Sequence, residues 1–236
     1  MAIDCILAMV PAEILANATL PPKIGWMSCH FSPCSTGLSN LPNAIPPGSL
    51  LIVDDWVPFQ NHDPGRILAQ LQEVWNCNDW SGLLLDFQRP GDPGTAEIVQ
   101  AVMEAFPDMV TVSQAYGEGL QCPIFLPPVP LDVALPDYLR PWQGREIWLD
   151  ISTMGQAIRL TSEGASATPL PYENQPESAH REPRLHCHYR IQVYQDRAEF
   201  TLFRTGEDLS DLLTEAKTLG VVNAVGLWQE LSPLLA

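Results

Sequence analysis

The chain has 236 residues, of which 46% are hydrophobic, enough to build a sizeable core in one large α/β domain or two small ones. It carries 28 acidic against 12 basic residues, for a formal net charge of −16 at pH 7. Nucleic-acid backbones and anionic membranes are bound by basic surfaces, so this charge argues against both as partners. The acidity otherwise favours solubility and indicates no particular function.

Six cysteines are scattered along the chain without the paired spacing of a zinc site, and we interpret them as reduced, mostly buried thiols. No Lys or Arg precedes the first apolar run, so the charged start of a signal peptide is missing. No apolar run approaches the roughly 20 residues of a membrane-spanning helix. We therefore expect a cytoplasmic protein, although a removed leader would overturn this.

Short, continuous apolar runs recur along the whole chain. Runs of this kind are typical of parallel strands that are buried on both faces. Eight such strands are predicted, at residues 3–10, 24–29, 49–54, 82–87, 109–115, 146–151, 198–204 and 221–228.

Three helices are well marked between these strands. Asp63-Pro64 supplies an N-cap and a first-turn proline, Thr95 is predicted to cap a second helix, and a third covers 207–219 and ends before Gly220. Eight strands with helices between them predict an irregular (β/α)8 barrel, whose usual size is about 250 residues. A doubly wound sheet is the alternative, but no G-x-G-x-x-G follows the first strands.

The hydrophobic pattern changes to period two between residues 150 and 204. Two hairpins are predicted there, with turns at Glu163-Gly164 and Gln195-Asp196. The polar piece between them, 172–183, is predicted to be a mobile loop. We therefore expect a single domain over 1–236 with a hairpin insertion at about 157–204.

In a barrel of this kind, the C-terminal ends of the strands meet at one mouth, where chemistry takes place. Planar polar groups beside aromatic rings suit a carbohydrate, whose hydroxyls need hydrogen bonds and whose apolar ring faces stack. Neighbouring strand residues point to opposite faces, so only one of Asp54 and Asp55 can face the mouth. The predicted strand ends supply Ser28, His30, Asp54, Asp55, Trp56, Asp86, Gln88, Arg89, Gln114, Tyr116, Glu118, Asp150, Trp228, Gln229 and Glu230.

Residues 81–90, S-G-L-L-L-D-F-Q-R-P, resemble the fourth-strand signature of family 18 glycoside hydrolases, the chitinase-like barrels. That signature reads D-G-x-D-x-D-(W/F/Y)-E-x-P. Ser81 and Leu84 replace its first two aspartates, and Gln88 stands where the family has its catalytic glutamic acid. The matching positions are Gly82, Asp86, Phe87 and Pro90.

The C-terminal segment 200–231 is similar to the last βαβ unit of the same family, in particular to its spore-associated branch. Trp228 matches the tryptophan that forms the floor of the family's sugar subsite. Asp150 ends the counterpart of the family's sixth-strand motif, from which the tyrosine is lost. Specific motif matches cover about a quarter of the chain.

The resemblance implies a mechanism that this sequence has lost. In the family, the N-acetyl group of the substrate attacks the anomeric carbon while the glutamic acid protonates the leaving oxygen. Gln88 cannot supply that proton. We therefore predict a decayed or non-hydrolytic barrel, a pseudoenzyme that binds an oligosaccharide or cell-wall glycan. The expected ligand residues are Asp55, Asp86, Gln88, Tyr116, Asp150 and Trp228.

Other readings of the same residues stay open. Asp86 and Gln88 could form a structural hydrogen-bonded pair, and an active glycosidase could use Glu118, Asp150 or Asp55 as a substitute carboxylate. A structural or protein-interaction role would use the hairpin region. His186 and His188 share one strand face, as metal ligands can, but without a third ligand we interpret them as ordinary strand residues. No metal or cofactor is predicted, and the sequence indicates no oligomeric state. The candidates for a catalytic role are thus Asp86, Gln88, Glu118 and Asp150.

Overall fold

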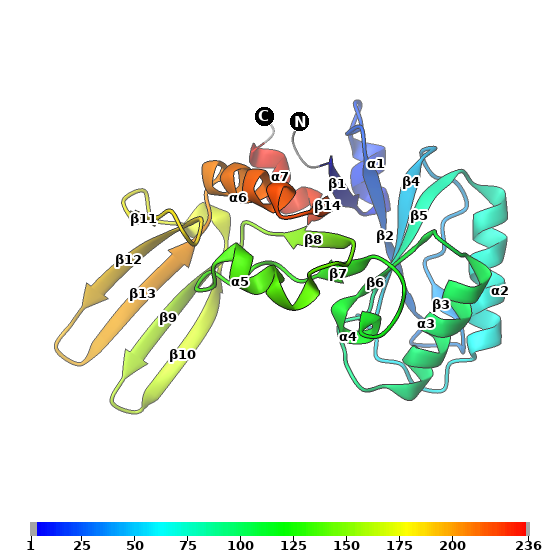
Figure 1. Ribbon diagram of the computed structural model, residues 1–236, viewed down its shortest axis with the longest axis horizontal. Helices are drawn as coiled ribbons and strands as arrows, with labels where there is room; N and C mark the ends of the chain where they lie inside the picture. Colours follow the sequence, from blue (N-terminus) through cyan, green and yellow to red (C-terminus); the bar gives the residue numbers. More distant parts are fainter. Residues whose placement is uncertain (1–3, 235–236) are drawn as a thin grey trace.

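The computed structural model describes residues 4–234, in which eight parallel strands close into a barrel (Figure 1). Their order is β1-β14-β8-β7-β6-β5-β4-β2, and pairing of β1 with β2 closes the cylinder. The predicted irregular (β/α)8 barrel is therefore confirmed; Ile3, where the first strand was expected to begin, lies outside the described residues. The strands are β1 (Asp4–Met9), β2 (Ile24–Phe31), β4 (Ser49–Asp54), β5 (Trp80–Asp86), β6 (Val110–Ser113), β7 (Ile124–Leu126), β8 (Ile147–Ile151) and β14 (Val221–Leu227).

One predicted barrel strand is wrong. Residues 198–204 do not enter the barrel, because 197–203 pair antiparallel within a separate sheet. The barrel strand that the sequence analysis missed is β7. Its three residues, Ile124–Leu126, lie between Pro123 and Pro127 and pair parallel with β6 and β8. Asp150 consequently ends the seventh barrel strand, not the sixth.

Helices cover the outside of the barrel unevenly. α2 (Pro64–Cys77) is capped by Asp63, α3 (Pro93–Ala105) by Asp92 rather than Thr95, and α6 (Gly206–Thr218) by Thr205. A strand hairpin replaces a helix after β2, where β3 (Leu38–Ser39) pairs antiparallel with it. The remaining helices are short: α1 (Pro11–Ala16), α4 (Gln114–Gly117), α5 (Leu135–Leu139) and α7 (Trp228–Leu231). No helix within 4–234 is long and apolar enough to span a membrane.

The strands separate two cores. Successive side chains along a strand point alternately into the barrel and out toward the helices. On β4, Leu50 and Ile52 belong to the interior cluster, whereas Leu51 and Val53 pack in the outer cluster with α2 and α3. The rest of the interior cluster consists of Ile6, Ala8, Leu84, Phe125 and Val225, with Met27, Trp148 and Leu227 at its edges. This alternation determines which strand-end residues reach the mouth.

A second sheet is inserted between β8 and α6 and extends away from the barrel (Figure 1). It is antiparallel with the order β10-β9-β13-β12-β11, so both predicted hairpins are confirmed. The predicted mobile loop 172–183 instead contains a 3-10 turn (Tyr172–Asn174) and β11, which pairs with β12. The strands are β9 (Gly155–Thr161), β10 (Gly164–Leu170), β11 (His180–Glu182), β12 (Cys187–Val193) and β13 (Arg197–Phe203).

Charged contacts fasten this inserted sheet to α6. The fully buried carboxylate of Asp208 accepts a hydrogen bond from Arg181 Nε at 2.9 Å, and its Oδ2 lies 2.7 Å from His188 Nδ1. The same carboxylate accepts from Thr205 and completes the capping box of α6. Nearby, the buried guanidinium of Arg204 donates to the backbone oxygens of Val129, at 2.6 Å, and of three other residues. The insert is thus anchored at its base.

Candidate functional site

Three aspartates point into the barrel at the ends of their strands. Asp54 continues the inward alternation of Leu50 and Ile52 on β4, and Asp86 follows Leu84 in the same way on β5. Asp150 is two residues beyond Trp148, which borders the interior cluster from β8. All three side chains therefore face the mouth, and all three residues are half-buried.

The three carboxylates stand on two walls of the mouth. Asp54 and Asp86 are direct partners in the β4–β5 register, so they are neighbours on one wall. β8, which carries Asp150, is three strands from β5 in the barrel order. In a cylinder of eight strands this places Asp150 on the opposite part of the rim from Asp86.

Gln88 contacts Asp86 directly. Its Nε2 donates a hydrogen bond to Asp86 Oδ1, and the residue itself is exposed to solvent. The amide therefore lies at the mouth, beside the carboxylate that the family signature retains. It can donate and accept hydrogen bonds there, but it has no proton to transfer near neutral pH.

Asp55 has a different role from the predicted one. It is buried, 6% exposed, and its two carboxylate oxygens accept the backbone N–H groups of Gln88 at 3.0 Å and Arg89 at 2.8 Å. Because the side chain next to Asp54 points to the opposite face of the strand, Asp55 is used to hold the chain just after β5. It fixes the position of Gln88 and is not a ligand group in the mouth.

Tyr116 also supports the loop after β5 and does not line the mouth. Its hydroxyl donates to the backbone oxygen of Arg89 and accepts from the N–H of Asp92 at 3.4 Å. Its ring meets Phe87 edge to face, with centroids 6.3 Å apart, and packs against the outer cluster. The predicted sugar-stacking role is replaced by a structural one, because α4 turns the chain outward directly after β6.

Trp228 lies in the outer layer of the barrel. It borders the cluster between the strands and α6, where it lines a cavity of about 770 Å³ together with Leu7, Leu209 and Leu213. The inward position at the end of β14 belongs to Leu227. Trp228 therefore does not form the floor of a sugar subsite, as the resemblance implied. It follows the inward-pointing Leu227 by one residue, so its indole lies on the outer side of the barrel wall.

The remaining candidate carboxylates are Glu118 and Glu230. Glu118 is an exposed residue that follows α4. Glu230 accepts from Ser152 Oγ at 2.5 Å and from the backbone N–H of Thr153 at 3.0 Å, so it holds the loop that leads from β8 into the inserted sheet. Its negative charge acts on Asp150.

The inward aspartates have raised pKa values, and the rise differs between them. Burial, then the charges of Asp86 and Glu230, raise the pKa of Asp150 to about 8. Burial also raises the pKa of Asp86 to about 6, although the hydrogen bond from Gln88 opposes the rise. The pKa of Asp54 is raised mainly by burial. Of the two carboxyls, Asp150 therefore holds a proton more readily than Asp86.

His186 and His188 help to hold the inserted sheet against α6. His186 Nε2 lies 2.5 Å from Glu215 Oε2, and His188 pairs with Asp208, both carboxylates being on α6. Between residues 4 and 234, no group of three or more His, Cys, Asp or Glu side chains could hold a metal ion.

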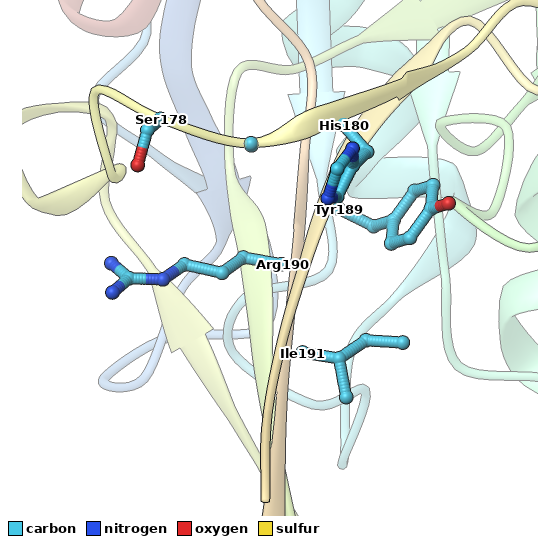
Figure 2. A pocket seen from close by; sticks show the side chains of 6 residues that line it. Ser178, His180, Tyr189, Arg190 and Ile191 are labelled. Carbon is cyan, nitrogen blue, oxygen red and sulfur yellow. The ribbon is translucent and has the colours of Figure 1, made fainter.

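A separate cavity of about 550 Å³ lies on the inserted sheet. Figure 2 shows the rings of His180 and Tyr189 close together, with centroids 5.6 Å apart, near Ile191. Arg190 and Ser178 line its other side (Figure 2). Ile191 is 50% exposed, so this cavity is a shallow surface feature distinct from the mouth.

Comparisons with known proteins agree on the fold. No protein-family model matches the chain, and no curated protein matches its sequence. A chitinase from Chromobacterium violaceum superposes with a TM-score of 0.65 at 10% identity over 95% of this chain and 93% of its own. The chitinase-like agglutinin of Robinia pseudoacacia gives 0.63 at 12% identity, covering 94% and 93% of the two chains.

A third similar structure is a family 18 chitinase from Cycas revoluta, solved as a double mutant in complex with (GlcNAc)4. Its TM-score is 0.60 at 11% identity, over 94% of both chains. Identities this low establish the architecture alone. The structural neighbours of this chain are thus family 18 chitinases and chitinase-like proteins, and its fold is their eight-stranded parallel barrel.

Proposed function

We propose that this chain is a family 18-like barrel that binds a glycan at its mouth and does not hydrolyse it by the substrate-assisted route. The observation that carries the proposal is the contact between Gln88 and Asp86 at the C-terminal end of β5. There the signature of the family would place its proton donor.

The chemistry of the amide supports loss of catalysis. A glycosidase acid must transfer a proton to the leaving oxygen, and a side-chain amide does not titrate near neutral pH. Losing general-acid catalysis typically costs a factor of about 10²–10⁴ in rate. Hydrogen bonding is unaffected by the replacement, because Gln88 keeps a donor and an acceptor at the same place.

Two structural neighbours support a binding role for such a barrel. The Robinia protein is described as a chitinase-like agglutinin. The Cycas chitinase in complex with (GlcNAc)4 carries a Glu-to-Gln substitution. A barrel of this fold with a Glu-to-Gln substitution is thus seen with (GlcNAc)4, and the ligand proposed for the present chain is an oligosaccharide or cell-wall glycan.

Calorimetry with chito-oligosaccharides and with peptidoglycan fragments tests the proposal. We expect saturable binding at millimolar ligand or below, loss of binding in Asp86→Ala, and no change in Glu73→Gln, an exposed residue of α2 on the outside of the barrel. Absence of binding to every glycan at millimolar concentration would refute the proposal.

The Gln88→Glu variant tests the assignment of the lost acid. A carboxylic acid at position 88 would lie beside Asp86 and could donate a proton, so we expect chitinase-like release of a chromogenic aglycone that the wild type lacks. The gain should be on the order of 10²-fold above background. Gln88→Ala, which adds no acid, should remain inactive; equal activity of the two variants would contradict the assignment.

A second candidate function is hydrolysis through Asp150. Its favouring observation is that the pKa of Asp150 is raised above that of Asp86, as the pKa of the acid is raised above that of its partner in two-carboxylate glycosidases. In that case the wild type would release a chromogenic aglycone, and Asp150→Asn would abolish the release. Inactivity of the wild type across a broad panel of glycosides would exclude this candidate.

A further inference from the structure

We propose that the inserted sheet is a dimerisation surface, through which two copies of this chain pack face to face. The inference does not depend on glycan binding at the mouth. It concerns one face of the sheet, the apolar face, which consists of positions 189, 191 and 193 of β12, 198, 200 and 202 of β13, 156, 158 and 160 of β9, and 165, 167 and 169 of β10.

The register of the strands brings these positions onto one face. Directly opposed residues of neighbouring strands share a face of a sheet. Val193, Ala198, Leu160 and Ala165 form one such row across four strands, and parallel rows follow toward the barrel. None of the positions on the apolar face carries a charged side chain, and the single amide among them is Gln156.

The opposite face of the same sheet is charged, as a face in contact with water should be. There Arg159 and Arg197 both pair with Glu199, with N···O distances of 3.5 and 2.7 Å. Arg190 and Gln192 share that face, because they alternate with the apolar positions of β12. The period-two pattern therefore leaves one face in water and prepares the other for packing.

Within residues 4–234, nothing covers the outer part of the apolar face. Val193 is 77% exposed, Ile191 50% and Leu160 39%, and even Phe200 on the central strand β13 is only partly buried. The barrel meets the sheet at its base, where Cys187 Sγ donates to the backbone oxygen of Leu131 at 3.4 Å, and the strands extend away from it (Figure 1). A sheet normally packs its apolar face against a second layer, so this one requires a partner.

The size of the apolar face fits a dimer of modest affinity. Six residues of each of four strands span about 20 Å by 19 Å, roughly 400 Å² per copy. The largest apolar patch of a typical monomer measures about 300–600 Å² and is often functional. Two copies would cover roughly 800 Å² of flat sheet, to which the relief of the side chains adds. This is close to the lower limit for a specific interface, about 1,000 Å², so we expect reversible association in the micromolar range.

Charge favours a second copy as the occupant. Two chains with a net charge of −16 repel each other, but none of their acidic residues lies on the apolar face, so no carboxylate has to lose its water when two such faces meet. A basic or strongly polar partner would find no charge on this face with which to pair. The partner must itself present a flat, uncharged apolar face, and every copy of this chain carries one.

The relief of the apolar face is also self-complementary. Its β12 side carries the large Ile191 and Val193, whereas its β10 side carries the small Ala165 and Ala167. A two-fold axis along the strands, between β9 and β13, places β12 of one copy over β10 of the other. Large side chains then meet small ones twice, as in an isologous interface.

Sedimentation equilibrium of the full chain, between about 5 and 200 μM, tests the dimer. We expect a monomer–dimer equilibrium that shifts toward the dimer when NaCl is raised from about 50 to 500 mM, because salt screens the repulsion between two acidic chains. Ile191→Lys should weaken association at least about tenfold, since it buries an unpaired charge. Gln192→Lys makes the same charge change on the opposite face and should behave as the wild type. A wild type that stays monomeric at 200 μM, or equal effects of the two variants, would overturn the inference.

A second pair of variants covers the case in which Ile191→Lys fails to fold. Ala165→Lys changes an exposed residue of the edge strand β10 and should weaken the dimer as Ile191→Lys does. Ser166→Lys, its neighbour on the opposite face, should leave association unchanged. Circular dichroism checks that each variant keeps the wild-type fold. Association that survives Ala165→Lys would contradict the facing of β10 and β12, and with it the proposed dimer.

Discussion

Asp55 shows how much of a site's geometry one buried residue can determine. Its carboxylate receives two backbone N–H groups directly after β5, at Gln88 and Arg89. These bonds fix the direction in which the chain leaves the barrel. They therefore fix the side chain of Gln88 relative to Asp86, although Asp55 itself does not face the mouth.

Replacing Asp55 with Asn should destabilise the fold. The amide retains a single acceptor oxygen, so at least one buried N–H loses its charged partner, at a cost of about 2–3 kcal/mol. Urea unfolding followed by circular dichroism measures this change. Glu118→Gln, an exposed acid-to-amide change, should alter the free energy of unfolding by less than about 0.5 kcal/mol. Equal stabilities of the two variants would show that the Asp55 contacts contribute little.

Asp150 should make the stability of the protein depend on pH. Burial raises its pKa to about 8 in the folded chain, against 3.8 for an ordinary aspartate, so the folded state binds the proton more tightly than the unfolded state. This contribution is complete below about pH 4 and is lost as pH rises through about 8. The free energy of unfolding should therefore fall by an amount on the order of a few kcal/mol over that range.

The Asp150→Asn variant isolates this effect. Because Asn does not titrate, the difference in unfolding free energy between variant and wild type should grow in favour of the variant from pH 4 to pH 9. Urea unfolding at four pH values across that range measures it. A difference that stays constant with pH would contradict the raised pKa.

Among the helices and strands, α6 is the one that holds the inserted sheet to the barrel through side-chain contacts. Asp208 joins three elements, because it caps α6 through Thr205 and receives Arg181 of β11 and His188 of β12. The residue is fully buried, so its charge depends on these partners. Asp211, one turn later, also contacts Arg181, but its side chain is 49% exposed.

The two aspartates offer a matched comparison. Asp208→Asn should cost about 3 kcal/mol or more, since it leaves the Arg181 guanidinium without its buried carboxylate partner. Asp211→Asn should cost less than about 1 kcal/mol, as expected for an exposed ion pair. Hydrogen exchange should show faster opening of β11 and β12 in Asp208→Asn only. Equal effects would mean that the exposed pairs, not the buried one, fasten the sheet.

Most helices and strands could be predicted from the sequence, but one strand of the barrel could not. β7 has only three residues between two prolines, too few to show any periodicity, so the sequence predicts no strand there. Residues 198–204 were apolar enough to take its place in the count. Their pairing with β9 and β12 became visible only with the coordinates, because strand pairing is a long-range property.

The candidate site was predictable only in part for a related reason. A strand that is apolar on both faces gives no sign of which face is inward, so Asp54 and Asp55 could not be distinguished. The same ambiguity put Trp228 in the mouth when Leu227 occupies the inward position. Asp86 and Asp150 lie near the carboxyl ends of β5 and β8, and Gln88 follows β5, as expected from the sequence; their role as ligand residues stays a prediction.

The whole molecule combines a chitinase-like barrel with an anchored antiparallel sheet beside its mouth (Figure 1). A cavity of about 580 Å³ lies between the two, lined by loop 128–132, Ser152, Met154 and the first residues of β9. Ser152 donates to Glu230, whose charge acts on Asp150. Glu230 therefore links the lining of this cavity to Asp150.

A crystal of the wild-type chain soaked in chitotetraose at pH 6.5 tests the central claim most directly. The account predicts an intact sugar chain in the barrel mouth, with hydrogen bonds to Asp86, Gln88 and Asp150. The account would be contradicted by a mouth that holds no sugar because protein side chains fill it. It would also be contradicted by sugar bound only in the cavity beside Tyr189 on the inserted sheet.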